Sequence, residues 1–144
     1  MAASATTPTD PATEAWTLLS RLMASRKGHM LATAASVDLS PPQMWALRHL
    51  EPDAPLPMSA LAGLLHCDNS NVTGIVDRLE ARGLVERRAA DHDRRVKHLV
   101  VTEAGVEVRR QVDARMNQPP PGFANLTADE QRRLATLLRK LTAD

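Results

Sequence analysis

The sequence predicts a mainly α-helical fold of the α+β class, and three observations lead to this prediction. Apolar residues recur at helical spacing (i, i+3, i+4 and i+7) along most of the 144-residue chain. The spacing changes toward strand-like alternation in one region, directly after Gly83, where a β-hairpin fits. Helices with broad apolar faces stand at both ends of the chain, and such faces need partners to cover them.

Composition narrows the class of protein further. Hydrophobic residues make up 43% of the chain, which is enough for a packed core. Trp16, Trp45 and Phe123 are the only aromatic residues, which argues against modules that stack bases on aromatic rings. The single cysteine, Cys67, excludes an intrachain disulfide and a cysteine-based zinc cluster. No apolar run reaches the roughly 18 residues of a membrane span, and the first ten residues lack a signal-peptide pattern.

The sequence of the N-terminal part predicts an arm followed by one long helix. Residues 1–9 offer little to bury, so we expect a flexible arm. Asp10 and Pro11 are a capping residue and a favoured first helical residue, and the apolar pattern runs to about Ala35. Gly28 weakens the middle of this helix and predicts a bend there.

Two short helices and a loop are expected next. Ser40 and Gln43 form a capping box with prolines at the helix entry. Residues 51–57 contain three prolines and predict a loop. A helix over 59–65 follows, and His66-Cys67 predicts a turn.

The helix over 69–82 is the most informative one. Asp68 is its expected cap and Gly83 its left-handed stop. One face is a continuous apolar stripe, made of Val72, Ile75, Val76 and Leu79. The opposite side carries small polar and charged residues, namely Ser70, Asn71, Thr73, Gly74, Asp77 and Arg78.

A hairpin and two helices complete the chain. Strands are expected at 84–88 and 94–101 around a polar turn at 89–93. Thr102 caps the next helix, which the prolines at 119–121 must end. The last helix begins at a capping box, and its apolar stripe consists of Leu134, Leu137, Leu138 and Leu141.

The order of these elements over 40–102 predicts a winged helix-turn-helix. A supporting helix, a tight turn and a second helix with a polar outer face form an arrangement that enters the major groove of DNA. Side chains at its start suit base edges and phosphates, namely Asn69, Ser70, Asn71 and Thr73, and Gly74 permits close backbone approach.

The charge distribution supports a polyanion-facing surface. The net charge is only +1, yet 78–97 holds seven basic against four acidic residues. Arg94 and Arg95 lie at the tip of the hairpin, where they can insert into a minor groove. Exposure to solvent would explain the polar face of the 69–82 helix alone, or the charged turn of the hairpin alone. It does not explain why the charged turn directly follows a helix with such a face.

The stretch from Met58 to Gly105 resembles the MarR family of bacterial transcriptional regulators. The pieces that carry the resemblance are DRLE at 77–80, RGLV at 82–85, and Asp93-x-Arg95 followed by Leu99, Thr102 and Gly105. The resemblance implies DNA contacts at Asn69, Ser70, Asn71, Thr73, Arg78 and Arg95, with Arg94 at a variable position. It also implies interdigitating dimerisation helices and an effector pocket between the dimer and DNA-binding lobes.

These inferences divide the chain into a 1–9 arm, a helical dimerisation region at 10–36 and 103–144, and a DNA-binding domain at 40–102. We expect a cytoplasmic, nucleoid-associated homodimer that binds an inverted-repeat operator on double-stranded DNA, most simply as a repressor. No cofactor, metal, membrane partner or enzymatic activity is expected, because no phosphate loop or catalytic constellation is present. The five histidines match no tight metal-ligand spacing.

The sequence leaves sensing and two rival functions open. Candidate effector residues for a small aromatic or anionic ligand are Trp16, Met23, His29, Met30, Met44, Trp45 and Arg48, although Met and Trp at helical spacing are more often core residues. Cys67, beside the helix cap, is either a redox sensor or a packed turn residue. The rivals are a winged-helix module for protein interaction or scaffolding, and a DNA binder with no effector.

Overall fold

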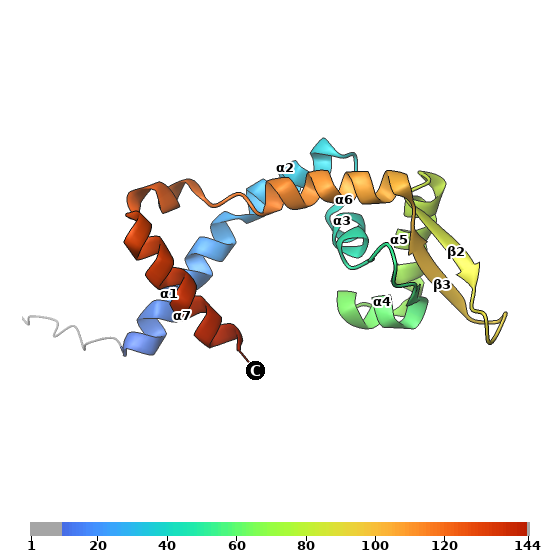
Figure 1. Ribbon diagram of the computed structural model, residues 1–144, viewed down its shortest axis with the longest axis horizontal. Coiled ribbons are helices and arrows are strands. Elements are labelled where there is room, and N and C mark those ends of the chain that lie inside the picture. Colours follow the sequence, from blue (N-terminus) through green and yellow to red (C-terminus); the bar gives the residue numbers. More distant parts are fainter. Residues whose placement is uncertain (1–9, 144) are drawn as a thin grey trace, which may run out of the picture.

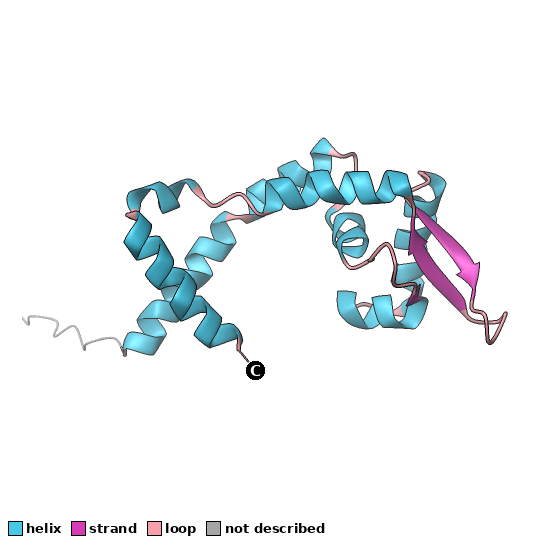
Figure 2. Cartoon of the chain, in the orientation of Figure 1, coloured by secondary structure: helices cyan, strands magenta, loops and turns pink. Residues whose placement is uncertain are grey.

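A computed structural model describes residues 10–143, and the predicted arm at 1–9 lies outside the described residues. The described chain is mainly helical with one small antiparallel sheet, which confirms the predicted fold class (Figure 2). In chain order the elements are α1 (Pro11–Ser25), α2 (Lys27–Ser36), α3 (Pro41–Arg48), β1 (Leu56–Pro57), α4 (Met58–Leu65), α5 (Asn69–Ala81), β2 (Val85–Ala89), β3 (Lys97–Val101), α6 (Glu103–Met116), the 3₁₀ helix η1 (Pro121–Asn125) and α7 (Ala128–Thr142).

The elements gather at two ends of an elongated molecule. Helices α3, α4 and α5 pack with the hairpin into one lobe, while α1 and α7 lie at the opposite end, where they overlap in this view (Figure 1). Helix α6 spans the distance between them and packs against α2 and α3. No helix among residues 10–143 is both long and apolar enough to cross a membrane.

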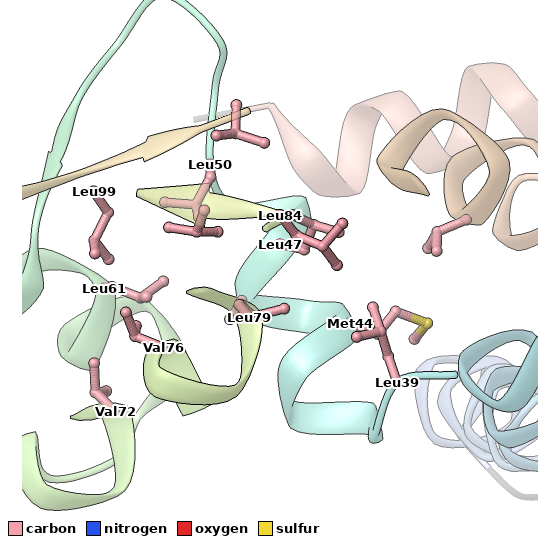
Figure 3. Packing of buried hydrophobic residues seen from close by; sticks show 14 of the residues in the cluster. Leu39, Met44, Leu47, Leu50, Leu61, Val72, Val76, Leu79, Leu84 and Leu99 are labelled. Atoms are coloured by element: carbon pink, nitrogen blue, oxygen red, sulfur yellow. The ribbon is translucent and has the colours of Figure 1, made fainter. Parts of the chain in front are cut away.

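The hydrophobic core lies inside the lobe, between α3, α4, α5 and the sheet (Figure 3). Helix α5 contributes the predicted stripe, of which Val72, Val76 and Leu79 are buried and Ile75 is half-buried. The other large, fully buried side chains are Met44, Leu47, Leu50, Leu61, Val85, Leu99 and Val112. The core therefore lies mainly in the lobe, and Val112 of α6 and Ala34 of α2 complete it from outside.

Most helix starts lie at the predicted capping residues. Asp10, Asp68 and Thr102 each accept a hydrogen bond from a backbone N–H in the first turn. Ser40 and Thr127 form complete capping boxes with Gln43 and Glu130, respectively. The stop after α5 is a left-handed Gly83 with φ of +68°.

The predicted long first helix is divided in two. Helix α1 ends at Ser25 and α2 begins at Lys27, so the break is at Arg26 and not at Gly28. The guanidinium of Arg26 donates to the carbonyl oxygens of Met116 and Gln118, at 3.3 and 2.9 Å. The break thus coincides with a contact that satisfies free carbonyls at the end of α6.

The hairpin is shorter and the sheet larger than predicted. The second strand begins at Lys97, not at residue 94, because Asp93 forms a turn with two backbone N–H groups. Its carboxylate accepts from Arg95 at 2.9 Å, and its carbonyl accepts from Val96 at 3.1 Å. The expected loop at 51–57 ends in β1, which pairs antiparallel with β3, so the strand order is β1-β3-β2.

The end helices leave their apolar faces uncovered within one chain. Neither α1 nor α7 has a fully buried residue. Trp16 on α1 is 64% exposed and Leu141 on α7 is 75% exposed. Apolar surface of this extent on two helices at the same end of the molecule is typical of an interface with another chain.

Candidate nucleic-acid interface

The N-terminus of α5 is built around the carboxylate of Asp68. Its Oδ1 accepts from the backbone N–H of Asn71 at 3.0 Å and from the hydroxyl of Ser70 at 2.8 Å. These bonds, the backbone one first, lower the pKa of Asp68 below its ordinary value of 3.8. The cap therefore stays ionised, while the remaining first-turn N–H groups of α5 face outward as donors for an anion.

The polar residues of α5 differ in how they can take part in binding. Thr73 donates its hydroxyl to the carbonyl of Asn69 at 2.9 Å, and Ser70 donates to Asp68. These two hydroxyls can therefore only accept further hydrogen bonds. Asn69 and Asn71 are exposed, and within residues 10–143 their carboxamides form no hydrogen bond, so each can both donate and accept.

A groove joins the start of α5 to the hairpin. Its volume is about 350 Å³, and its lining includes Asn69, Thr73, Arg95 and Lys97. Arg94 and Arg95 lie in the exposed turn that Asp93 organises. The structure thus brings two of the predicted helix contacts beside one of the predicted wing contacts.

The opposite flank of α5 faces a larger cavity of about 660 Å³. Asn71, Gly74 and Arg78 form part of its wall from α5, and Trp45 forms part of it from α3. The remaining lining residues are mostly apolar and belong to α3, α4 and α5 or the loops that flank them: Ser40, Pro41, Pro42, Gln43, His49, Leu64, Leu65, Cys67 and Ile75. Five of the predicted contacts therefore divide between the two flanks of the helix.

Two carboxylates on α5 are held by an arginine that the sequence did not single out. Arg87 on β2 contacts Asp77 at 2.6 Å and Glu80 at 2.8 Å. Hydrogen bonds and charge from these carboxylates outweigh the desolvation that lowers the pKa of Arg87, so its pKa is raised. The available signal was the spacing of Asp77 and Glu80 by one helical turn, followed by an arginine on the next strand.

The predicted effector residues do not gather at one place. Trp16 and Met23 are exposed on α1, and Met44 is fully buried in the core of the lobe. Nε2 of His29 lies 2.7 Å from the carbonyl oxygen of Arg115 at the end of α6. Met30 is half-buried and packs against the core.

Trp45 and Arg48 lie together on α3. The guanidinium of Arg48 stacks over the Trp45 ring, 4.9 Å from its centroid. Both residues line a depression of about 320 Å³ that also includes Arg109 and Asp113. Of the predicted effector set, Trp45 and Arg48 thus share the wall of one depression, and Trp45 also lines the larger cavity.

Cys67 is half-buried in the wall of the larger cavity, one residue before the cap of α5. Within residues 10–143 there is no cluster of three or more His, Cys, Asp or Glu side chains placed to hold a metal ion.

Comparison with known proteins gives matches in sequence and in structure. Residues 39–97 match the MarR family. An 84-residue stretch is 39% identical to the transcriptional repressor MprA of Escherichia coli K12; it covers 58% of this chain and 48% of MprA, so the match spans about half the length of that relative. A MarR family protein from Bacillus stearothermophilus superposes with a TM-score of 0.79 at 26% identity, covering 91% of this chain and 92% of that one. Wild-type MarR from E. coli in its apo form gives 0.75 at 25% identity, covering 86% and 93%.

Proposed function

We propose that the chain, whose residues 39–97 match the MarR family, is a member of that family and a homodimeric, sequence-specific DNA-binding regulator that represses transcription from an inverted-repeat operator. One observation carries the proposal most directly. The start of α5 and the arginine-bearing wing line the same groove, with Asn69 and Thr73 on one side and Arg95 on the other. A helix for the major groove thus lies beside a loop for the backbone or minor groove.

These side chains suit different parts of a DNA duplex. The carboxamides of Asn69 and Asn71 suit a bidentate contact with a base edge, adenine above all. Arg78, Arg94 and Arg95 are exposed cations suited to phosphates, and Ser70 adds a hydroxyl acceptor. Gly74 has open space where a side chain would stand, so the backbone of α5 can approach the duplex closely.

The uncovered faces of α1 and α7 support assignment of 10–36 and 103–144 to dimerisation. A second copy that brings the same two helices would cover Trp16, Leu137 and Leu141 in a twofold interface. The two copies of α5 would then face neighbouring major grooves, with half-sites roughly 34–36 Å apart. Residues 40–102 form the DNA-binding unit in this arrangement.

The cavity of about 660 Å³ supports an effector site. Its apolar wall and the cation of Arg78 favour a small aromatic or anionic ligand. Asn71 and Arg78 belong both to this wall and to the proposed DNA surface, so ligand and DNA would compete for them. An effector of this kind shifts binding by its differential affinity, typically about 1–3 kcal/mol.

Footprinting with the purified protein on DNA upstream of its own gene tests the proposal. We expect protection of an inverted repeat, and an affinity that falls by orders of magnitude between about 50 and about 200 mM salt. A module for protein interaction or scaffolding would protect no sequence and would show no steep salt dependence. Equal binding to every duplex would contradict sequence-specific regulation.

A further inference from the structure

Arg87 occupies a protected position between the wing and the proposed recognition helix. Its side chain is 22% exposed, whereas those of its partners Asp77 and Glu80 are 59% and 41% exposed. The guanidinium contacts Asp77 at 2.6 Å through one terminal nitrogen and Glu80 at 2.8 Å through the other. One arginine thus pairs with two carboxylates of α5 at once.

The same residue also closes an exposed edge of the sheet. In the order β1-β3-β2, strand β2 pairs with β3 on one side only. The backbone N–H of Arg87 on the free side donates to Oε2 of Glu80 at 3.1 Å. Helix α5 therefore covers part of the free edge of β2, which ties the wing to the helix by backbone and side chain together.

Asp77 and Glu80 lie on a helix that must approach a polyanion. Asp77 directly precedes Arg78, and both residues are exposed. Without a counter-ion, two carboxylates on this surface would repel DNA phosphates, because like charges in a partly dehydrated interface interact unfavourably. Arg87 supplies the counter-ion from behind the surface.

We propose that Arg87 is a positioning residue for DNA binding, which acts as an internal counter-ion for Asp77 and Glu80 and holds the wing against α5. The inference rests on the proposed function, but it assigns a role to a residue outside the surface that touches DNA. It predicts that loss of Arg87 lowers DNA affinity because Asp77 and Glu80 are then left unpaired.

A set of three variants tests this prediction by electrophoretic mobility shift on the protected operator and on a scrambled duplex. Arg87→Gln is expected to weaken binding to both duplexes by about tenfold or more. The triple variant R87Q/D77N/E80Q is expected to regain most of this loss, because the unpaired charges are gone. Arg88→Gln is the matched control: it removes the same charge from the next strand position, where Arg88 pairs with the exposed Glu86 at 2.8 Å.

Two results of this comparison would overturn the proposal. Equal losses for Arg87→Gln and Arg88→Gln would reduce the effect to net charge, and a triple variant as weak as Arg87→Gln would show that the carboxylates are not responsible. Thermal unfolding of each variant identifies misfolding, and the triple variant, which lacks all three partners, provides the comparison if Arg87→Gln is unstable.

The salt dependence separates positioning from direct contact. Because salt screens the repulsion between unpaired carboxylates and phosphates, the loss in Arg87→Gln should shrink as salt rises. The triple variant R87Q/D77N/E80Q lacks these carboxylates and should keep the wild-type slope of log affinity against log salt. A slope reduced by about 1 in the triple variant would mean that Arg87 itself contacts a phosphate and would contradict the proposal. If the wild-type protein binds no DNA, the proposed function itself fails. If Arg95→Ala weakens binding while Arg87→Gln does not, only the role of Arg87 fails.

Discussion

Arg48 on α3 donates a hydrogen bond from Nε to Oδ1 of Asp113 on α6, at 2.7 Å. The other oxygen of Asp113 lies 3.7 Å from Nε of Arg109, which also contacts Glu51 at 2.7 Å and donates to the carbonyl of Leu50. The C-terminal end of α3 is therefore fixed to α6 by two arginines. Because α6 connects the lobe to the helices at the opposite end, these contacts help set the orientation of the lobe.

Replacing Asp113 by alanine should loosen this junction. Both arginines lose an acceptor, but the side chain of Asp113 is about one-third exposed, so solvent screens the pairs and the cost is about 1 kcal/mol. Urea unfolding followed by circular dichroism measures this cost. Glu107→Ala, on the same helix, removes an exposed pair with Arg110 and a hydrogen bond from Gln111, both within α6, and should change the midpoint much less. Equal effects of the two variants would show that the junction contributes nothing.

Features of this fold that depend on neighbouring residues could be predicted, and those that depend on distant ones could not. The capping boxes at Ser40 and Thr127 are complete within four residues, so the sequence shows them directly. The break at Arg26 coincides with a contact to Met116, 90 positions away. No local pattern at residues 26–28 contains that information.

In the candidate site, too, local features could be predicted and features that depend on distant residues could not. The order of elements predicts a hairpin directly after the second helix, and the structure has Asn69 of that helix and Arg95 of the hairpin lining one groove. The proposed effector set was drawn from spacing along single helices, which cannot distinguish a buried Met44 from a cavity wall. The cavity itself is formed between α3, α4 and α5, so it depends on their packing.

Gly105 should tolerate no side chain. A Cβ built there would overlap the carbonyl oxygen of Leu84 and lie 2.6 Å from Cγ2 of Val101. Because the first neighbour is backbone and cannot move independently, Gly105→Ala should cost about 1–3 kcal/mol by overpacking. Gly63→Ala in α4 meets no atom within 4 Å and should be neutral or stabilising. Chemical unfolding of the two variants compares them, and a neutral Gly105→Ala would contradict the close approach.

Replacing Arg95 or Asn71 by alanine should weaken DNA binding in different ways. Arg95→Ala removes a cation, so it should weaken binding to operator and scrambled duplexes alike and reduce the salt slope by about 1. Asn71→Ala removes a base-reading carboxamide, so it should cost about 1–3 kcal/mol on the operator with an unchanged salt slope. Fluorescence anisotropy at several salt concentrations measures both. Equal loss on both duplexes for Asn71→Ala would exclude the base-reading role.

Leu141→Glu should dissociate the proposed dimer. The side chain is 75% exposed in one chain, and its burial against a second copy contributes about 2 kcal/mol per subunit. A twofold interface doubles this to about 4 kcal/mol, or about a thousandfold in dissociation constant. Sedimentation equilibrium measures the change. Thr136→Glu adds the same charge away from the leucine stripe of α7 and should leave the dimer intact; dissociation by both variants would indicate a general charge effect.

Asp68, the cap of α5, should make the stability of the fold depend on pH only under acidic conditions. The bonds to Asn71 and Ser70 depress the pKa of Asp68 below 3.8, so the ionised cap stabilises the fold at every pH above that value. The stabilisation begins to be lost as the unfolded state, with its ordinary pKa, takes up a proton, and it is gone once pH has fallen through the depressed pKa of the folded state. Asp68→Asn keeps a capping oxygen without a titrating group, so the difference in melting temperature between the two proteins should be constant from about pH 7 to about pH 5 and change only below. Asp68→Asn should also bind DNA more tightly at neutral pH, since it removes a negative charge near the phosphates. A difference in melting temperature that already varies above about pH 5 would mean that another group controls the titration.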